Sequence, residues 1–197
     1  MPKIGVSKPY VADYSWSGSA VTYSNGQILA KAAELSTTMN SSSDNNFYAD
    51  NAISEADTEF SNGTGTLTVD DLLADAAKAI YGLSQTTYTG TEETQVPINH
   101  YNNEMSSPYK GLGIIIMLKN NGTVKWRGVI LNKVQFTLPS EAVQTKGATI
   151  NWQTTPLPFT IMRDDTAKQE WMQDGVFESE EAALAWIKSV LTPKVEE

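Results

Sequence analysis

The sequence predicts a mainly β fold with one flanking helix at about residues 70–82 and a C-terminal helix at about residues 179–191. Turn-forming residues recur about every dozen positions through the Ser-, Thr-, Asn- and Gly-rich N-terminal part, a spacing typical of antiparallel strands. Apolar runs flank a tight-turn signal at Asn121-Gly122, and two apolar stripes have helical spacing. With 197 residues, we expect one domain, 1–197, in which residues 164–197 form a C-terminal helical extension.

Three Asn-Gly segments predict tight turns, because both residues tolerate the positive φ that hairpins need. They are Ser24-Asn25-Gly26, Asn62-Gly63 and Asn120-Asn121-Gly122. After the last turn, side chains at a spacing of two predict a strand with one apolar face. That face consists of Val124, Trp126, Ile130, Val134, Phe136 and Leu138.

The opposite face of this strand is polar but is interrupted by Val129 and Leu131. A strand that is apolar on both sides is covered on both sides. The cover is either a helix of the same chain or a neighbouring subunit. Val129 and Leu131 are therefore candidates for contact between subunits.

Capping residues mark both helices. Asp70 or Asp71 can cap the first helix, and Gly82 is expected to end it in a left-handed conformation. Ser179 is expected to cap the second helix. Its buried stripe is predicted to be Ala183, Trp186, Ile187 and Val190.

Three segments are harder to interpret. Gln27–Leu35 has the composition of a helix. Ile53–Phe60 reads better as a strand, because Glu55 and Glu59 would repel each other across a helical turn, whereas on a strand Glu55, Asp57 and Glu59 line one face. Residues 83–109 show no periodicity, so they are expected to form a long polar segment without regular structure.

Composition excludes several functional classes. The chain has no cysteine and a net charge of −9, so thiol chemistry and tight binding of nucleic-acid phosphates are not expected. The lack of cysteine suits a reducing cytoplasm. No secretion signal or membrane-spanning apolar run is recognised, so we expect a soluble protein with no membrane partner.

The sequence contains no motif typical of a catalytic, cofactor-binding or metal site. Nucleotide-binding loops and nucleophile elbows are missing, and the single histidine, His100, lies in a polar segment with no nucleophile nearby. Adjacent acids such as Asp164-Asp165 point in different directions, which does not suit a carboxylate hydrolase. We expect a protein that is not an enzyme and needs no cofactor.

Several short stretches resemble the major tail proteins of siphophages, particularly the phi13-type group. The most telling is Phe47-Tyr48-Ala49-Asp50-Asn51 followed by Glu55-Ala56-Asp57. The others are Lys3-Ile4-Gly5-Val6, Tyr23-Ser24-Asn25-Gly26, Gly65-Thr66-Leu67-Thr68-Val69, Asn132-Lys133-Val134-Gln135-Phe136 with Thr145-Lys146-Gly147, and Phe177-Glu178-Ser179. The polar insert at 83–109 and the Asn-rich stretch before Phe47 depart from the family pattern.

The resemblance implies a β-sandwich or barrel-like tail-tube fold whose subunits form rings of six that stack into a hollow tube. It also implies that residues 27–35 are strand rather than helix. The implied partners are other copies of the chain, the tape measure and tail-terminator proteins, and double-stranded DNA that passes without specific binding. The implied location is the virion tail, assembled in the cytoplasm of the host bacterium.

Within this picture, acids along the tube wall would repel DNA phosphates, so Glu55, Asp57 and Glu59 are candidates for lumen-facing charge. The polar segments 83–109 and 40–46 are candidates for ring-to-ring contact, with Pro97, His100, Tyr101 and Asn45 as representative residues. Two other functions stay open. One is a carbohydrate- or receptor-binding β-sandwich on a virion or cell surface, and the other is a carboxylate hydrolase.

Overall fold

The computed structural model describes residues 1–49, 52–90, 94–138, 141, 143–145 and 152–192, and for residues 42–49 and 52–58 it describes the backbone alone. The strands are β1 (Lys3–Trp16), β2 (Val21–Ile28), β3 (Ala32–Ala49), β4 (Ala52–Val69), β5 (Ser84–Thr89), β6 (Gln95–His100), β7 (Tyr109–Asn120), β8 (Thr123–Phe136), β9 (Thr155–Met162) and β10 (Met172–Phe177). The helices are α1 (Ala74–Tyr81) and α2 (Glu180–Leu191).

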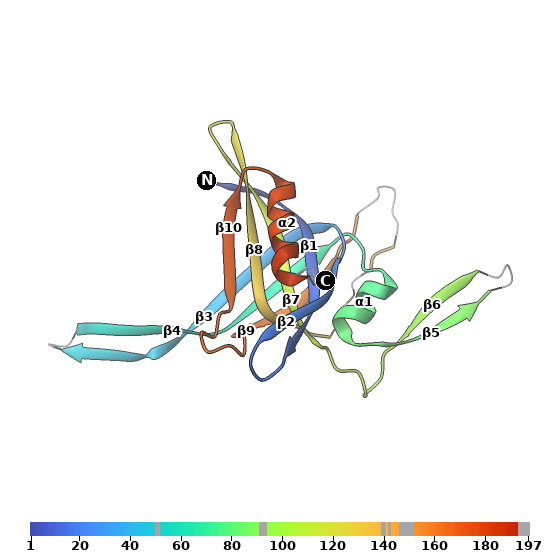
Figure 1. Ribbon diagram of the computed structural model, residues 1–197, viewed down its shortest axis with the longest axis horizontal. Helices are drawn as coiled ribbons and strands as arrows, with labels where there is room; N and C mark the ends of the chain where they lie inside the picture. Colours follow the sequence, from blue (N-terminus) through green and yellow to red (C-terminus); the bar gives the residue numbers. More distant parts are fainter. Residues whose placement is uncertain (50–51, 91–93, 139–140, 142, 146–151, 193–197) are drawn as a thin grey trace.

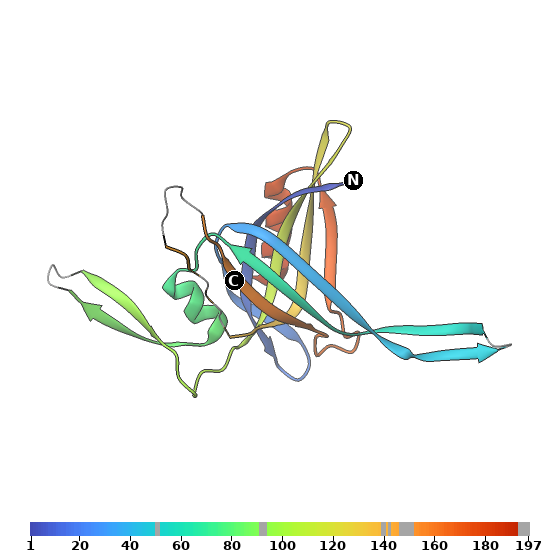
Figure 2. The same ribbon diagram turned by 180° about the vertical axis from the view of Figure 1, so that it is seen from behind.

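Most of the strands form one antiparallel sheet in the order β2-β1-β7-β8-β9-β4-β3, with β10 also paired to β8. Strands β5 and β6 form a separate two-stranded sheet. The large sheet folds over on itself, with α2 against its outer side and with β9, β4 and β3 on the far side from α2 (Figures 1 and 2). The predicted mainly β fold with two short helices is therefore confirmed.

Strand β8 allows this fold because its outer edge changes partner part way along. Residues 126–131 pair with β10, whereas residues 133–136 pair with β9. Between the two stretches β8 has one more residue than β7, which is a β-bulge. A one-residue shift moves the following side chains to the other face. Ile130 therefore packs with α2 while Val134 and Phe136 join the opposite core, so the prediction that all three share a face is wrong.

Two apolar cores result from this arrangement. The main core lies between the two halves of the folded sheet and is extended by Ala76, Ala77 and Ile80 of α1. The second core lies under α2, where Ala183, Ile187 and Leu191 pack on the sheet. Trp186 and Val190 are only partly buried, so Leu191 replaces them in the buried stripe that the sequence predicts.

The helix ends follow the predicted signals in part. Gly82 ends α1 with φ 65° and ψ 37°, and the hydroxyl of Ser179 accepts a hydrogen bond from Ala182 N at the start of α2, as predicted. The first helix begins later than expected, because its N-cap is Leu73, which makes no side-chain cap. The carboxylate of Asp70 instead accepts a hydrogen bond from Lys31 N at 3.1 Å.

Several predicted turns and loops need correction. The turn at Asn121-Gly122 is confirmed, with φ 47° and 84°. Ser24-Asn25-Gly26 lies inside β2 as an irregularity in its pairing with β1, and Asn62-Gly63 lies inside β4, so neither is a hairpin turn. Residues 27–35 belong mainly to β2 and β3, since partners on the sheet outweigh their weak helix preference. The predicted irregular segment 83–109 contains the β5–β6 hairpin.

Candidate assembly surfaces

Two stretches of two-stranded sheet project from the folded body. The long arm is the outer part of β3 and β4, from the pair Ser41 and Phe60 to the pair Ala49 and Ala52. The short arm is the hairpin of β5 and β6. They extend from opposite sides of the body (Figures 1 and 2). A two-stranded ribbon alone is marginally stable in water. In the part of the chain that the structure describes, no further strand pairs with the outer edges of either arm, so both arms offer strand edges for contact.

The root of the long arm is held by Arg163. The last pair between β4 and β9 joins Gly63 to Ile161. Beyond it, the guanidinium of Arg163 donates from Nε to the carbonyl oxygen of Phe60 at 2.9 Å and also from Nη2 to the same oxygen. The Phe60 ring stacks on Trp171 with centroids 4.4 Å apart. Arg163 therefore takes over from β9 in satisfying the β4 backbone where the arm leaves the sheet.

The predicted acidic ladder lies on the long arm. Backbone pairing places Glu55 opposite Phe47 and Asp57 opposite Asn45, so the prediction of a strand for these residues is confirmed. The side chains of Glu55, Asp57 and Asn45 lie outside the described part of the structure. Glu59 is described, and its carboxylate lies 3.4 Å from Nη2 of Arg163. Part of its charge is therefore neutralised at the arm root.

The inner part of the short arm is tied to the start of α1. Gln85 Nε2 donates to Asp75 Oδ1 at 3.1 Å, and Asn99 Nδ2 donates to the carbonyl oxygen of Ala74 at 2.9 Å. Both side chains lie on the same face of the hairpin, because the two residues are cross-strand partners. This face also carries Pro97 and is otherwise polar. The direction of the hairpin is thus set by side-chain contacts with the helix.

The other face of the short arm is apolar and open to solvent. It carries Tyr88, Val96 and Ile98, which are 61%, 42% and 41% exposed. At the inner end of the same face, His100 Nε2 is 2.8 Å from the hydroxyl of Thr86. The strand residues 84–89 and 95–100 include no acidic residue, lysine or arginine. Exposed apolar side chains that share one face of a ribbon indicate a contact surface.

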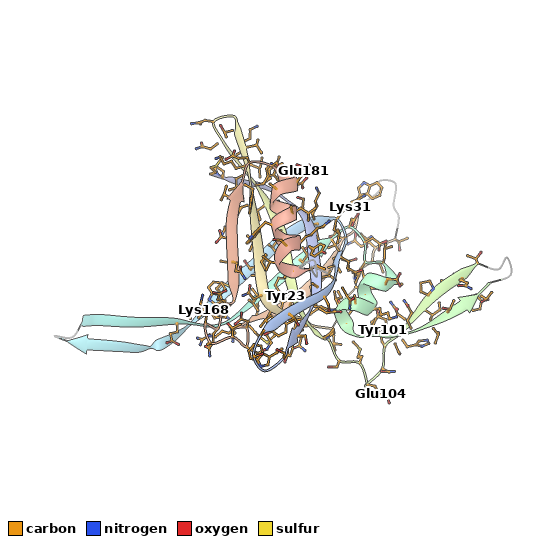
Figure 3. All side chains as sticks on the ribbon, in the orientation of Figure 1. Tyr23, Lys31, Tyr101, Glu104, Lys168 and Glu181 are labelled. Atoms are coloured by element: carbon orange, nitrogen blue, oxygen red, sulfur yellow. The ribbon has the colours of Figure 1, made fainter. Side chains whose placement is uncertain are left out.

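The residues predicted to contact other subunits lie in different environments. His100 lies at the base of the apolar face, Pro97 lies on the polar face, and Tyr101 is exposed where β6 rejoins the body (Figure 3). Val129 and Leu131 are only 8% and 2% exposed, because they belong to the chain's own main core. The structure therefore offers neither of them as a contact surface, and the second cover of β8 is α2 of the same chain.

A charged and aromatic cluster fixes the 163–171 loop to the sheet. Lys133 Nζ lies 2.6 Å from Asp165 Oδ2 and also approaches the rings of Tyr14 and Tyr109. Tyr14 donates its hydroxyl to Asp165 Oδ2 at 2.7 Å. The hydrogen bonds from Lys133 and Tyr14 lower the pKa of Asp165 below its ordinary value. Burial and the hydrogen bond to Asp165 raise the pKa of Tyr14. At neutral pH Asp165 is therefore an ionised carboxylate and Tyr14 is a neutral phenol that donates to it.

A second ion pair lies in a cavity of about 540 Å³ between β1, β2 and α1. Lys110 is buried there against the carboxylate of Asp13, which also accepts from Asn25 Nδ2 at 2.7 Å. Burial acts to raise the pKa of Asp13, but the hydrogen bonds from Lys110 and Asn25 outweigh it and leave that pKa lowered. Each charged group in the wall of this cavity has a hydrogen-bond partner within the protein.

Within the described residues, His, Asp and Glu side chains do not gather in a group of three that could hold a metal ion. Among the same residues, neither helix has the length and apolar character needed to cross a membrane.

Some of these features had no clear signal in the sequence. Arg163 and Trp171 are far from the long arm along the chain, and only the fold brings them to its root. The spacing of Val96 and Ile98 at i and i+2 was a usable sign of a strand, although a run this short is easily missed. A comparison of the chain with protein-family models and with curated proteins finds no match.

Proposed function

We propose that this chain is the repeating subunit of a phage tail tube, in which rings of six copies stack into a conduit for DNA. The observation that carries this proposal is the pair of two-stranded arms on opposite sides of one β body. A subunit with contact elements on opposite sides can reach two neighbours at once, and repeated contacts of this kind give rings or filaments.

Electrostatics support the same proposal. The net charge of −9 gives the assembled wall a field that opposes binding of phosphates, so a duplex can slide through without being held. Glu55, Asp57 and Glu59 are proposed to face the lumen. The pairing of Glu59 with Arg163 offsets part of the charge that Glu59 brings to this ladder. Tape measure and tail-terminator proteins are the proposed further partners, and the virion tail is the proposed location.

Negative-stain microscopy of the concentrated protein tests the proposal. We expect hollow tubes of constant width. On dilution, these tubes should either depolymerise or shorten to stacks of a few rings. A matched variant replaces residues 87–97 by a short Gly-Ser turn, which keeps the Gln85 and Asn99 contacts with α1. It should fold, by circular dichroism, but not form tubes. A wild-type protein that stays monomeric at every concentration would disprove the tube function.

A carbohydrate- or receptor-binding role is the alternative, and one observation favours it. Tyr88 and Tyr101 are exposed aromatic side chains on or beside the short arm, and aromatic rings of this kind can stack on sugars. Binding of the monomer to a glycan array, lost in Tyr88→Ser and Tyr101→Ser, would support this role. Ordered tubes with no glycan binding would reject it.

A further inference from the structure

The folded sheet leaves an open seam between β1 and β3. Residues Lys3–Ser7 of β1 pair with β7 on one edge, and β2 begins to pair with β1 only at Tyr10. Residues Ala32–Thr37 of β3 pair with β4 on one edge. Across the described part of the chain, the other edge of each of these two stretches has no strand partner. We call these two facing stretches the seam.

The seam is hollow, and its walls combine apolar side chains with the charged residues Lys3, Lys8, Lys31 and Glu34. Two cavities of about 250 Å³ and about 200 Å³ open along it, and both are lined by Val6. The first also has Leu35 and Ile116 in its wall, and the second has Ile28 and Ala30. The lining residues Val6, Ala30, Leu35 and Ile116 are partly buried and continue into the main core, whereas Ile28 is exposed.

These dimensions favour side chains as the occupant. Both cavities are smaller than the roughly 300–1,000 Å³ that small-molecule sites usually have. An apolar groove next to an exposed residue such as Ile28 suits aliphatic and aromatic side chains presented by another protein surface.

The short arm has the matching properties. Tyr88, Val96 and Ile98 project from one face of a narrow ribbon, so they form a raised apolar ridge rather than a groove. The arm points away from its own body beyond α1, while Lys31, which lines the smaller cavity, lies on the body (Figures 1 and 3). The ridge is thus directed away from the seam of its own chain.

The charges of the two surfaces are compatible with a second copy of this chain as the partner. Two copies with a net charge of −9 repel each other, and a contact made by an uncharged arm avoids adding close like-charge pairs. The strands of the arm have no lysine or arginine with which to hold a nucleic acid. A ridge and a groove at different places on one surface are complementary to each other and not to themselves.

We propose that the apolar face of the short arm packs into the seam of a second copy of the chain. The proposal rests on the self-assembly proposed above and specifies one of its contacts. Because donor and acceptor surfaces differ, the contact is head-to-tail and repeats from copy to copy, closing into rings or continuing as filaments.

Cysteine cross-linking tests this contact cleanly, because the chain has no cysteine of its own. Val96→Cys places a thiol on the ridge, and Thr37→Cys places one at the wall of the larger cavity. Each variant alone should give little dimer with a short bismaleimide, whereas an equal mixture should give a strong dimer band. Strong self-linking of Val96→Cys would show arm-to-arm contact and overturn the proposal. The proposal would also be overturned if the mixture of the two variants formed tubes or oligomers without cross-links between Val96→Cys and Thr37→Cys.

A second pair of variants gives an independent measure. Ile98→Thr removes apolar surface from the ridge, and Thr89→Ser is its matched control on the polar face. Loss of one buried aliphatic contact should raise the critical concentration for assembly about tenfold, with no change in the control. Equal effects of the two variants would overturn the proposal.

These outcomes also separate the contact from the tube function. Cross-links between the two cysteine variants in soluble oligomers, without tubes, would contradict the proposed tube function and support the proposed contact between arm and seam. Tubes that form without this cross-link would support the tube function and contradict the contact. A chain that never associates would reject both.

Discussion

The packing of α2 on β7 can be tested by substitutions at Gly113 and Ile187. Ile187 is fully buried, and its side chain fills the space over Gly113. A Cβ atom added at Gly113 would lie less than 3.0 Å from Cγ2 of Ile187 and 3.3 Å from Cδ1 of Leu191. Each residue therefore limits the size of the other. This packing is what provides β8 with its cover within the same chain.

The expected magnitudes follow from this contact. Ile187→Ala leaves a cavity in the second core and should lower the free energy of unfolding by about 2–5 kcal/mol. Gly113→Ala forces the helix outward and should cost about 1–3 kcal/mol. In the double variant the new methyl group occupies the space that Ile187 leaves. Its cost should therefore be smaller than the sum of the two single costs by about 1–2 kcal/mol.

Urea unfolding followed by tryptophan fluorescence measures the wild type, the two single variants and the double variant, and Trp186 on α2 is one of the five tryptophans that contribute to the signal. Gly5→Ala is the control, because its new Cβ would meet Met117 Cβ at an ordinary 3.8 Å. Its effect should stay within about 0.5 kcal/mol. Strictly additive costs, or a neutral Gly113→Ala, would show that α2 does not pack on β7 as described.

Three further predictions concern other buried or paired groups. The hydroxyl of Tyr81 is buried and has no hydrogen-bond partner among the described residues. Tyr81→Phe should therefore raise the free energy of unfolding by about 1–2 kcal/mol, measured by thermal or urea denaturation. A lower free energy of unfolding in this variant would contradict the prediction. Burial raises the pKa of Tyr81 to about 12, so above its ordinary value of 10.0 the unfolded chain loses this proton first and stability falls as pH rises. That loss should be smaller in the phenylalanine variant. Arg163→Lys should speed hydrogen exchange at the root of the long arm around Phe60 while leaving the core amides unchanged, because lysine cannot present two donors from a planar group to the Phe60 carbonyl. Unchanged exchange there would show that Arg163 does not hold the arm. The hydrogen bonds from Lys133 and Tyr14 lower the pKa of Asp165, so its contribution to stability is present above the ordinary value of 3.8 and is lost as pH falls below it. Asp165→Asn should therefore reduce the fall in the free energy of unfolding at acidic pH. An unchanged fall would argue against the pairing of Asp165 with Lys133 and Tyr14.

Local signals in the sequence predicted the elements that depend on nearby residues. The hairpin at Asn121-Gly122 and the left-handed end of α1 at Gly82 were found because positive φ strongly favours Asn and Gly. The start of α2 was found because Ser179 caps it within three residues. In each case the stabilising partner lies within one turn of the residue that reveals it.

Where the partner is distant, the sequence was misleading. Asn62-Gly63 has the composition of a turn but lies in β4, since β3 on one side and β9 on the other hold it as strand. The bulge in β8 moves Val134 and Phe136 to the face opposite Ile130, so one period-two pattern describes two surfaces. Val129 and Leu131 appeared available for a neighbouring subunit because the strands that bury them in the main core are distant in the chain and could not be placed over β8 from the sequence.

The sequence by itself determined a mainly β chain, its two helices, the absence of cysteine chemistry and an acidic character that opposes binding of nucleic acid. These properties depend on composition and on contacts between residues close together in the chain. Only the tertiary structure decided where the two arms leave the body, that Tyr88, Val96 and Ile98 form an exposed apolar ridge, and that β1 and β3 face each other across the seam. Exposure depends on which distant strands and helices find each other, and that is fixed only when the whole chain packs.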